Sequence, residues 1–206
     1  MSVSQAIKST SCQVQKKVDA FTAGAARVGR GTAAGFLGGL IASWMMNQYQ
    51  AIESKPVNLR REEERLAYAR PKGRQKKSEH AEQNSKSDGD DATVKVAEQV
   101  SRKLFDHPLS PAEKKIAGPT VHYGYGALVG ALYGGLSELI PSVGMGIGIP
   151  YATLLWLFGS ETAVPALGLA KPPAKVPARK HASALATHFV YGLILDISRR
   201  ILRRVL

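Results

Sequence analysis

Residues 119–141 read PTVHYGYGALVGALYGGLSELIP, and this stretch decides the predicted fold. It carries no charge between His122 and Glu138. At 1.5 Å per residue, a helix from Pro119 to Ile140 would be about 33 Å long, and the hydrocarbon core of a bilayer is about 30 Å thick. Glycine destabilises helices in water but is common where helices pack closely in lipid. The stretch therefore predicts a transmembrane helix with a seam of glycines four residues apart: Gly126, Gly130 and Gly134.

Three further apolar segments complete a predicted bundle of about four transmembrane helices. Residues 31–50, GTAAGFLGGLIASWMMNQYQ, are expected to form the first span. The helix at about 119–140 follows as the second, with the others at about 143–160 and 182–200 in a membrane region over residues 116–206. The predicted fold is an all-α integral membrane protein. We expect the glycines of the first span, Gly31, Gly35 and Gly39, to pack against those of the second.

A short internal sequence repeat suggests the hypothesis of two duplicated helical hairpins. Residues 122–126, HYGYG, and 188–192, HFVYG, share the order His, aromatic, any residue, Tyr, Gly. Each lies near the start of an apolar segment, so spans one and two would match spans three and four. A chance repeat is the alternative, because the pattern has only three fixed positions.

The charges are segregated along the chain. The formal net charge is +12, the isoelectric point is near 9.9 and the mean hydropathy is −0.12. Residues 1–30 carry +4 and residues 171–206 carry +7, whereas residues 116–170 carry −2. Basic flanks on apolar spans are typical of membrane proteins. Since no zinc-finger, helix-turn-helix or RNA-binding pattern accompanies the charge, we expect no nucleic-acid partner.

The polar segments are expected at the membrane surface. Residues 1–30 space apolar side chains along a basic amphipathic helix. Residues 51–115 form a polar insertion with interfacial helices, in which residues 71–91 lack large apolar side chains and should be disordered. Within the insertion, Ser110 is a predicted N-cap, and Glu113 completes a capping box.

Five ionisable residues in the apolar segments are candidate functional groups: His122, His188, Glu138, Glu161 and Asp196. Such groups are costly in lipid and tend to face a bundle interior or a water-filled cavity. A structural role is the alternative. Asp196 is placed to pair with Arg199 or Arg200, and the histidines could bond to backbone across the seam.

The sequence predicts no enzyme. It has no G-x-S-x-G elbow, no phosphate-binding P-loop and no H-E-x-x-H motif, so no catalytic residue or cofactor is assigned. The two candidate histidines are on different segments without His-x3-His spacing, so no metal site is expected. The single cysteine, Cys12, excludes an intrachain disulfide.

Three stretches are similar in order and character to the YagU-like bacterial inner-membrane proteins. They are GFLGGLIASWMMNQYQAIESKP (35–56), PALGLAKPP (165–173) and THFVYGLILDISRRILRR (187–204). The resemblance implies a multi-pass protein of the bacterial inner membrane, in a family whose molecular activity is unassigned and which has been linked to acid tolerance. It implies no site residues, and the lysine-rich residues 71–91 depart from the family pattern.

Two functions follow as hypotheses. The first is a non-enzymatic scaffold or accessory subunit of a membrane assembly, with the glycine seams packing helices and the basic insertion meeting anionic lipid headgroups or a membrane-protein partner. The alternative is a small protein that handles protons, ions or a solute through its histidines and carboxylates. The lipid bilayer is the expected partner in both, and a homo-oligomer is an open possibility.

Overall fold

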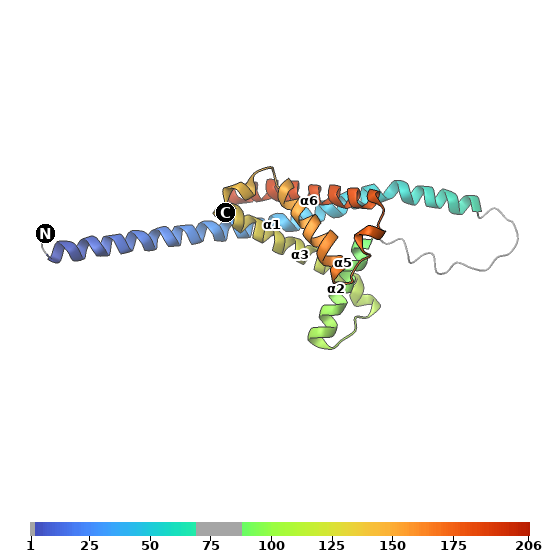
Figure 1. Ribbon diagram of the computed structural model, residues 1–206, viewed down its shortest axis with the longest axis horizontal. Coiled ribbons are helices and arrows are strands. Elements are labelled where there is room, and N and C mark those ends of the chain that lie inside the picture. The colour runs from blue at the N-terminus through green and yellow to red at the C-terminus, as the bar shows by residue number, and fades with distance from the viewer. Residues whose placement is uncertain (1–2, 69–87) are drawn as a thin grey trace.

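The computed structural model describes residues 3–68 and 88–206, which are mostly helical (Figure 1). The long helices are α1 (Val3–Tyr68), α2 (Asp88–Phe105), α3 (Pro111–Leu139) and α6 (Ala178–Val205). Shorter elements connect α3 to α6: the 3-10 turn η2 (Pro141–Gly144), α4 (Ile149–Leu154), the π-helix η3 (Leu155–Ala163), α5 (Val164–Ala166) and the 3-10 turn η4 (Pro173–Lys175).

The body of the molecule forms around the middle of α1. Helices α3 and α6 both pack along this part of α1, and α4 packs against α6. Figure 1 shows α1 extending beyond the body at both ends, with α2 and the start of α3 forming a projection to one side. Helix α1 is therefore the central helix of the body, since both α3 and α6 pack against it.

Glycines bring α1 and α3 into backbone contact. A Cβ atom added at Gly130 would lie 2.8 Å from the Cα of Gly39, and one added at Gly134 would lie 2.9 Å from the Cα of Gly35. Gly31 faces Gly134 in the same way. Any side chain at these positions would push the two helices apart, so the glycine spacing sets the distance between them.

The core contains two tyrosines whose hydroxyl groups are satisfied inside the body. Tyr133 and Tyr191 are buried together with Ala42 and Leu195. The Tyr191 hydroxyl donates to the Gly126 carbonyl at 2.6 Å. A helical carbonyl oxygen has a second lone pair, so it accepts this bond while keeping its helical one. The tyrosine therefore ties α6 to α3 at a seam glycine.

The predicted capping box at the start of α3 is confirmed. The Ser110 hydroxyl accepts from the Glu113 backbone N–H at 3.3 Å, and the Glu113 carboxylate accepts from the Ser110 N–H at 2.7 Å. The helix then continues through Pro119 to Leu139 without a break. The capping box at Ser110 and the glycine seam are therefore parts of the same helix, α3.

The prediction of transmembrane helices is wrong. Among the helices of residues 3–68 and 88–206, none is both long enough and apolar enough to cross a bilayer. The sequence argument relied on length and absence of charge. Leu, Ile, Phe and Val supply most of the favourable transfer energy, whereas residues 31–50 and 119–140 contain many Gly, Ala and Tyr. An all-helical bundle replaces the predicted integral membrane bundle of about four spans and duplicated hairpins.

The predicted segment limits fall differently in the structure. The segment at 143–160 is divided among η2, α4 and η3, because Gly146 and Gly148 take left-handed φ values of 73° and 77° and interrupt the helix. Helix α1 runs on past residues 30 and 50, and the segment at 182–200 lies inside α6. Residues 71–87 of the segment expected to be disordered lie outside the described residues, and residues 88–91 begin α2.

Candidate functional site: an arginine cluster and a histidine cluster

The five candidate residues divide between two clusters in the body. Glu138 and Asp196 meet the side chains of Arg27, Arg199, Arg200 and Arg203; we call these six residues the arginine cluster. His188, Glu161 and His122 lie toward the other end, with Ser160 and His181; we call these five the histidine cluster. On α3, His122 and Glu138 are separated by about 24 Å of helix.

Asp196 is the buried centre of the arginine cluster. Its side chain is 0% exposed. One carboxylate oxygen accepts from the Tyr133 hydroxyl at 2.9 Å and lies 3.3 Å from Arg199 Nη2. The other accepts from Arg200 Nε at 2.7 Å. Removing a carboxylate from water is costly, and these bonds offset that cost because both oxygens find donors.

Glu138 joins α1, α3 and α6. Its Oε1 accepts from Arg203 Nε at 2.9 Å and lies 3.8 Å from Arg199 Nη1. Its Oε2 lies 3.7 Å from Arg27 Nε, and its backbone carbonyl accepts from Arg27 Nη2 at 2.9 Å. Gly31 leaves the space on α1 that the Glu138 side chain occupies. The glycine seam and the ion pairs are therefore packed against each other.

The arginine cluster has more positive than negative groups. Four guanidinium groups share two carboxylates, which leaves a formal charge of +2. Arg199 is 8% exposed, its guanidinium carbon lies 5.5 Å from the Tyr133 ring centroid, and its Nε has no hydrogen-bond partner. Arg27 and Arg200 are half exposed. Their remaining N–H groups are positioned at the surface, where an anion can reach them.

Sequence reasoning found part of this cluster. The pairing of Asp196 with Arg199 and Arg200 is confirmed, because residues three and four apart on a helix are neighbours. Reasoning from sequence missed Arg27, Arg203 and Tyr133. Arg203 follows Arg199 by four positions and could have been placed on the same face. The contact of Arg27 on α1 with Glu138 on α3 joins distant parts of the sequence, so no spacing of nearby residues predicts it.

His188 is half-buried in the histidine cluster. Its Nδ1 lies 2.7 Å from the Ala184 carbonyl, which can only accept, so Nδ1 carries the proton. Its Nε2 lies 3.3 Å from the Ser160 hydroxyl and can accept from it. Burial lowers the pKa of His188 below its ordinary value of 6.5, and the nearby His122 lowers that pKa further, against the hydrogen bond to Ala184. His122 itself is half-buried on α3, with its ring edge-to-face against Tyr123.

His181 has the opposite environment. Its Nδ1 lies 2.8 Å from Glu161 Oε2, and its Nε2 lies 3.2 Å from the Pro173 carbonyl. With an acceptor at each nitrogen, the imidazolium form is favoured, and the hydrogen bond to Glu161 raises the pKa of His181 above 6.5. Reasoning from sequence did not select His181. Glu161 lies on the π-helix η3, and π-helical turns are frequent at functional sites.

The two histidines should make opposite contributions to the pH dependence of stability. The lowered pKa of His188 gives stability that is present above pH 6.5 and is lost as the pH falls through its folded pKa. The raised pKa of His181 gives stability that is present below pH 6.5 and is lost as the pH rises through its folded pKa.

Denaturant unfolding at about pH 7.5 and about pH 5.5 checks these signs. The His188→Gln variant should lose less stability on acidification than the wild-type chain, and His181→Gln should lose more. If both variants show the wild-type difference between the two pH values, the stated protonation states are wrong.

In the described part of the chain, no three His, Cys, Asp or Glu side chains lie close enough together to hold a metal ion. The chemistry that the two clusters display is ion pairing and proton binding. In the arginine cluster the carboxylate oxygens of Glu138 and Asp196 are occupied by arginine, which leaves the guanidinium N–H groups as the available donors.

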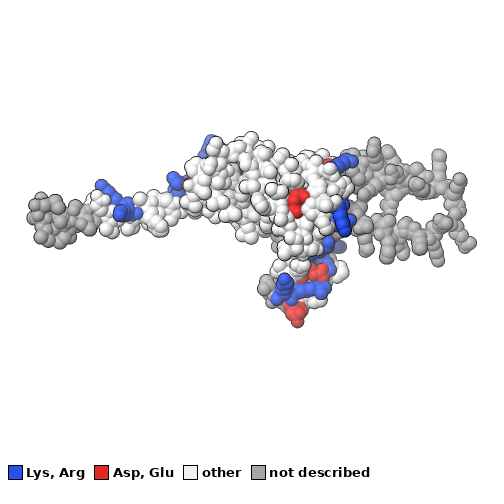
Figure 2. Space-filling view, in the orientation of Figure 1, with Lys and Arg blue, Asp and Glu red and all other residues white. Residues whose placement is uncertain are grey.

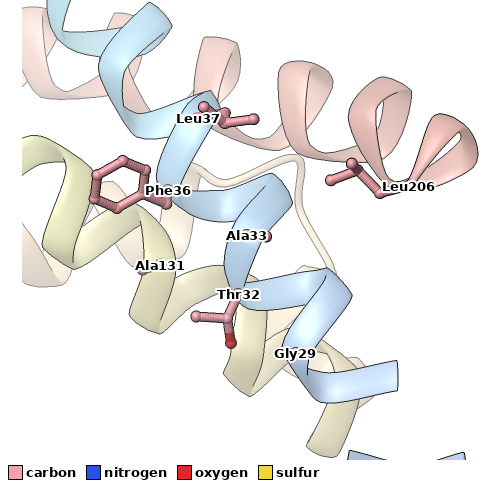
Figure 3. Close-up of a pocket in the computed structure, with 7 residues that line it drawn as sticks. All are labelled: Gly29, Thr32, Ala33, Phe36, Leu37, Ala131 and Leu206. Atoms are coloured by element: carbon pink, nitrogen blue, oxygen red, sulfur yellow. The ribbon is translucent and has the colours of Figure 1, made fainter. Parts of the chain in front are cut away.

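An apolar groove lies along one face of α1. It has a volume of about 650 Å³ and lies between one face of α1, α3 and the end of α6. Figure 3 shows Phe36 and Leu37 on α1, Ala131 on α3 and Leu206 directly after α6 around it, and the other lining residues are Gly29, Thr32 and Ala33. On the face shown in Figure 2, the middle of the body carries few charges, whereas Lys and Arg lie toward its ends and on the α2 projection.

Comparison with known proteins gives one family. Residues 102–197 match the model of a family described as a protein of unknown function (DUF1440). The matched range contains Glu138 and Asp196 of the arginine cluster and all of the histidine cluster, and it leaves out α1 and the arginines after Asp196. No curated protein and no solved structure matches the chain. Over residues 102–197, this chain is therefore similar to a family whose function is unknown.

Proposed function

We propose that the protein is a non-enzymatic scaffold or accessory subunit that assembles with partners through the apolar exterior of its body. One observation carries the proposal: large apolar side chains face outward on every long element of the body. We call this set the apolar exterior; it comprises Phe36, Leu37, Ile41, Trp44, Leu128, Leu132, Leu154, Leu157, Phe158, Ile197 and Ile201. Exposed apolar surfaces on this scale mark interaction sites.

The arrangement of polar groups supports the same function. Ionic and hydroxyl groups such as Asp196 and Tyr133 are inside, and leucines such as Leu128 are outside at 66% exposure. Burying one exposed leucine contributes about 1.5–3 kcal/mol. A partner with an apolar surface thus gains from contact with the exterior, while the glycine seam and ion pairs hold the helices in register.

The nature of the assembly rests on the family resemblance. We propose that the chain is a YagU-like relative, which the match over residues 102–197 supports. Association with the bacterial inner membrane is part of this proposal, with the lipid bilayer, anionic headgroups, a membrane protein or a second copy as partners. Flotation of the purified chain with lipid vesicles tests whether the bilayer is a partner. The chain should float with the vesicles and stay at the bottom of the gradient without them.

Two substitutions on α3 test the scaffold proposal. Leu128 and Leu132 are four residues apart and are exposed. Changing both to Gln should weaken partner association about 100-fold, because about 3 kcal/mol of apolar burial is lost. The matched control changes Val14 and Val18 to Gln, also four apart and exposed but outside the apolar exterior.

Size-exclusion chromatography with light scattering measures the mass of the gently purified protein. The wild-type chain and the control should run well above the 22.1 kDa of one chain, and the Leu128/Leu132 variant should run closer to it. A wild-type mass of one chain, or equal masses for both variants, contradicts the proposal.

The alternative function, handling of protons, ions or a solute, stays a prediction. Its candidate residues occupy two clusters, with His122, His188 and Glu161 in one and Glu138 and Asp196 in the other. The opposite environments of His188 and His181 are the observation in its favour. Denaturant unfolding of the His188→Gln and His181→Gln variants at two pH values tests the proton binding of the histidine cluster.

A further inference from the structure

We infer that a second copy of this chain packs against the outer side of α3, with the two α3 helices antiparallel about a two-fold axis near Leu132. This inference rests on the proposed function and deepens it, because it names the partner and its place on the apolar exterior. The contact surface comprises Tyr125, Leu128, Leu132 and Leu139, which we call the α3 stripe.

Helix α3 is covered on the sides that face the rest of the body. Its seam glycines meet α1. The Tyr133 hydroxyl donates to Asp196 on α6, and the Val129 carbonyl accepts from the Tyr151 hydroxyl on α4 at 2.7 Å. The α3 stripe lies on the remaining side, along one edge of the body in Figure 1, and its four side chains are between 54% and 66% exposed. At these exposures, no element of the described residues covers this side.

The spacing of the α3 stripe is that of a contact between two helices. Its members follow one another at intervals of three, four and seven residues, which are the a and d positions of a heptad repeat. The d position between Leu132 and Leu139 is Gly135. In an antiparallel pair centred on Leu132, Leu128 of the partner subunit would lie next to Gly135, where the missing side chain leaves room. The stripe is therefore complementary to a second copy of itself.

Charge favours a second copy over anionic lipid at this surface. Residues 116–137 contain no Asp, Glu, Lys or Arg, so the nearest basic residue of α3, Lys115, precedes Tyr125 by ten positions or about 15 Å of helix. An apolar stripe that binds anionic headgroups has Lys and Arg close beside it. Two chains that each carry a formal charge of +12 can meet here without bringing charged side chains of the stripe together.

The arginine cluster favours the antiparallel orientation. The cluster contains Glu138, at one end of the α3 stripe, and has a formal charge of +2. Parallel α3 helices would place two such clusters side by side, and like charges repel. Antiparallel helices centred on Leu132 separate the two copies of Glu138 by about 18 Å along the helix axis.

The mass of the chain purified to a single polypeptide tests the identity of the partner. Light scattering should give twice the 22.1 kDa of one chain. If the gently purified assembly is large but the single polypeptide runs as one chain, this inference is overturned and the scaffold proposal stands. A gently purified protein with the mass of one chain contradicts both.

Cysteine cross-linking of the full chain tests the place and the orientation of the contact. The exposed Cys12 is first replaced by Ser. Leu132→Cys, Tyr125→Cys and Leu154→Cys are then made separately in that background and treated with a mild oxidant. Leu154 is the matched control, since it is 52% exposed but lies on α4. Circular dichroism confirms that each variant is folded.

Leu132→Cys should give at least about tenfold more covalent dimer than the other two variants, because a disulfide requires Cα atoms within about 7 Å. The two-fold axis brings both copies of residue 132 together, whereas both copies of residue 125 are about 21 Å apart along the axis. Non-reducing electrophoresis measures the yield.

Equal yields at Leu132→Cys and Leu154→Cys would place the contact elsewhere, and equal yields at Leu132→Cys and Tyr125→Cys would mean parallel helices. Either result overturns this inference. A chain that still has the mass of a dimer would then leave the scaffold proposal standing.

Discussion

Replacing Asp196 by alanine should lower the free energy of unfolding by about 3–5 kcal/mol, the largest effect that we expect from one substitution. The change leaves Arg199 buried beside an empty space and removes the acceptor of the Tyr133 hydroxyl. Arg199 would keep only the more distant Glu138, at 3.8 Å, and a poorly compensated buried charge and an unsatisfied buried hydroxyl are both costly. Guanidinium denaturation followed by circular dichroism measures the loss.

The control for this prediction is Asp19→Ala. Asp19 is exposed on α1, and its carboxylate accepts from the nearby Gln15 side chain at 2.9 Å. Its removal should change stability by no more than about 0.5 kcal/mol. Asp196→Asn adds a second comparison, since it keeps an oxygen for Tyr133 while removing the charge. Equal stability of the Asp196→Ala and Asp19→Ala variants would show that the arginine cluster does not hold the body together.

Replacing Gly130 by alanine should lower the free energy of unfolding by about 1–3 kcal/mol, although alanine is the better helix former. The new methyl group would meet the backbone of α1 at Gly35 and Gly39, and backbone cannot move aside as a flexible side chain can. Helices α1 and α3 must then separate, which loosens the contacts on either side. Thermal and denaturant unfolding report the change.

Gly124 provides the matched control in the same helix. A Cβ atom there would meet nothing within 4 Å. Gly124→Ala should therefore raise stability by up to about 1 kcal/mol, since only the helix propensity changes. The two glycine substitutions in α3 should thus have opposite signs. A gain in stability at both positions would mean that the seam is looser than these distances indicate.

The helical architecture could be predicted where the signal was local. The capping box of Ser110 and Glu113 and the pairing of Asp196 with Arg199 depend on residues within four positions, and sequence spacing identifies them. The glycine repeats predicted close helix packing, and the structure places the two sets of glycines against each other. The inference from those repeats to lipid was wrong, because close packing does not make a helix apolar enough to cross a bilayer.

The candidate site could be predicted only in part. The five ionisable residues were selected because each interrupts an apolar segment, and a residue such as Arg27 in a basic segment gives no such signal. Its contact with Glu138 joins positions 111 residues apart. The division of the candidates into two clusters depends on the order in which α3, η3 and α6 pack, and no local pattern records that order.

The unbroken length of α1 fixes the distance and the relative rotation between anything bound at its two ends. Its 66 residues extend about 100 Å at 1.5 Å per residue, and the body holds only its middle. A rod of this kind sets both spacing and angle. Each residue inserted upstream of the glycine seam would move the leading end outward by about 1.5 Å and turn it by about 100° relative to the body. Anything bound at the two tips is thereby held at a defined separation and rotation.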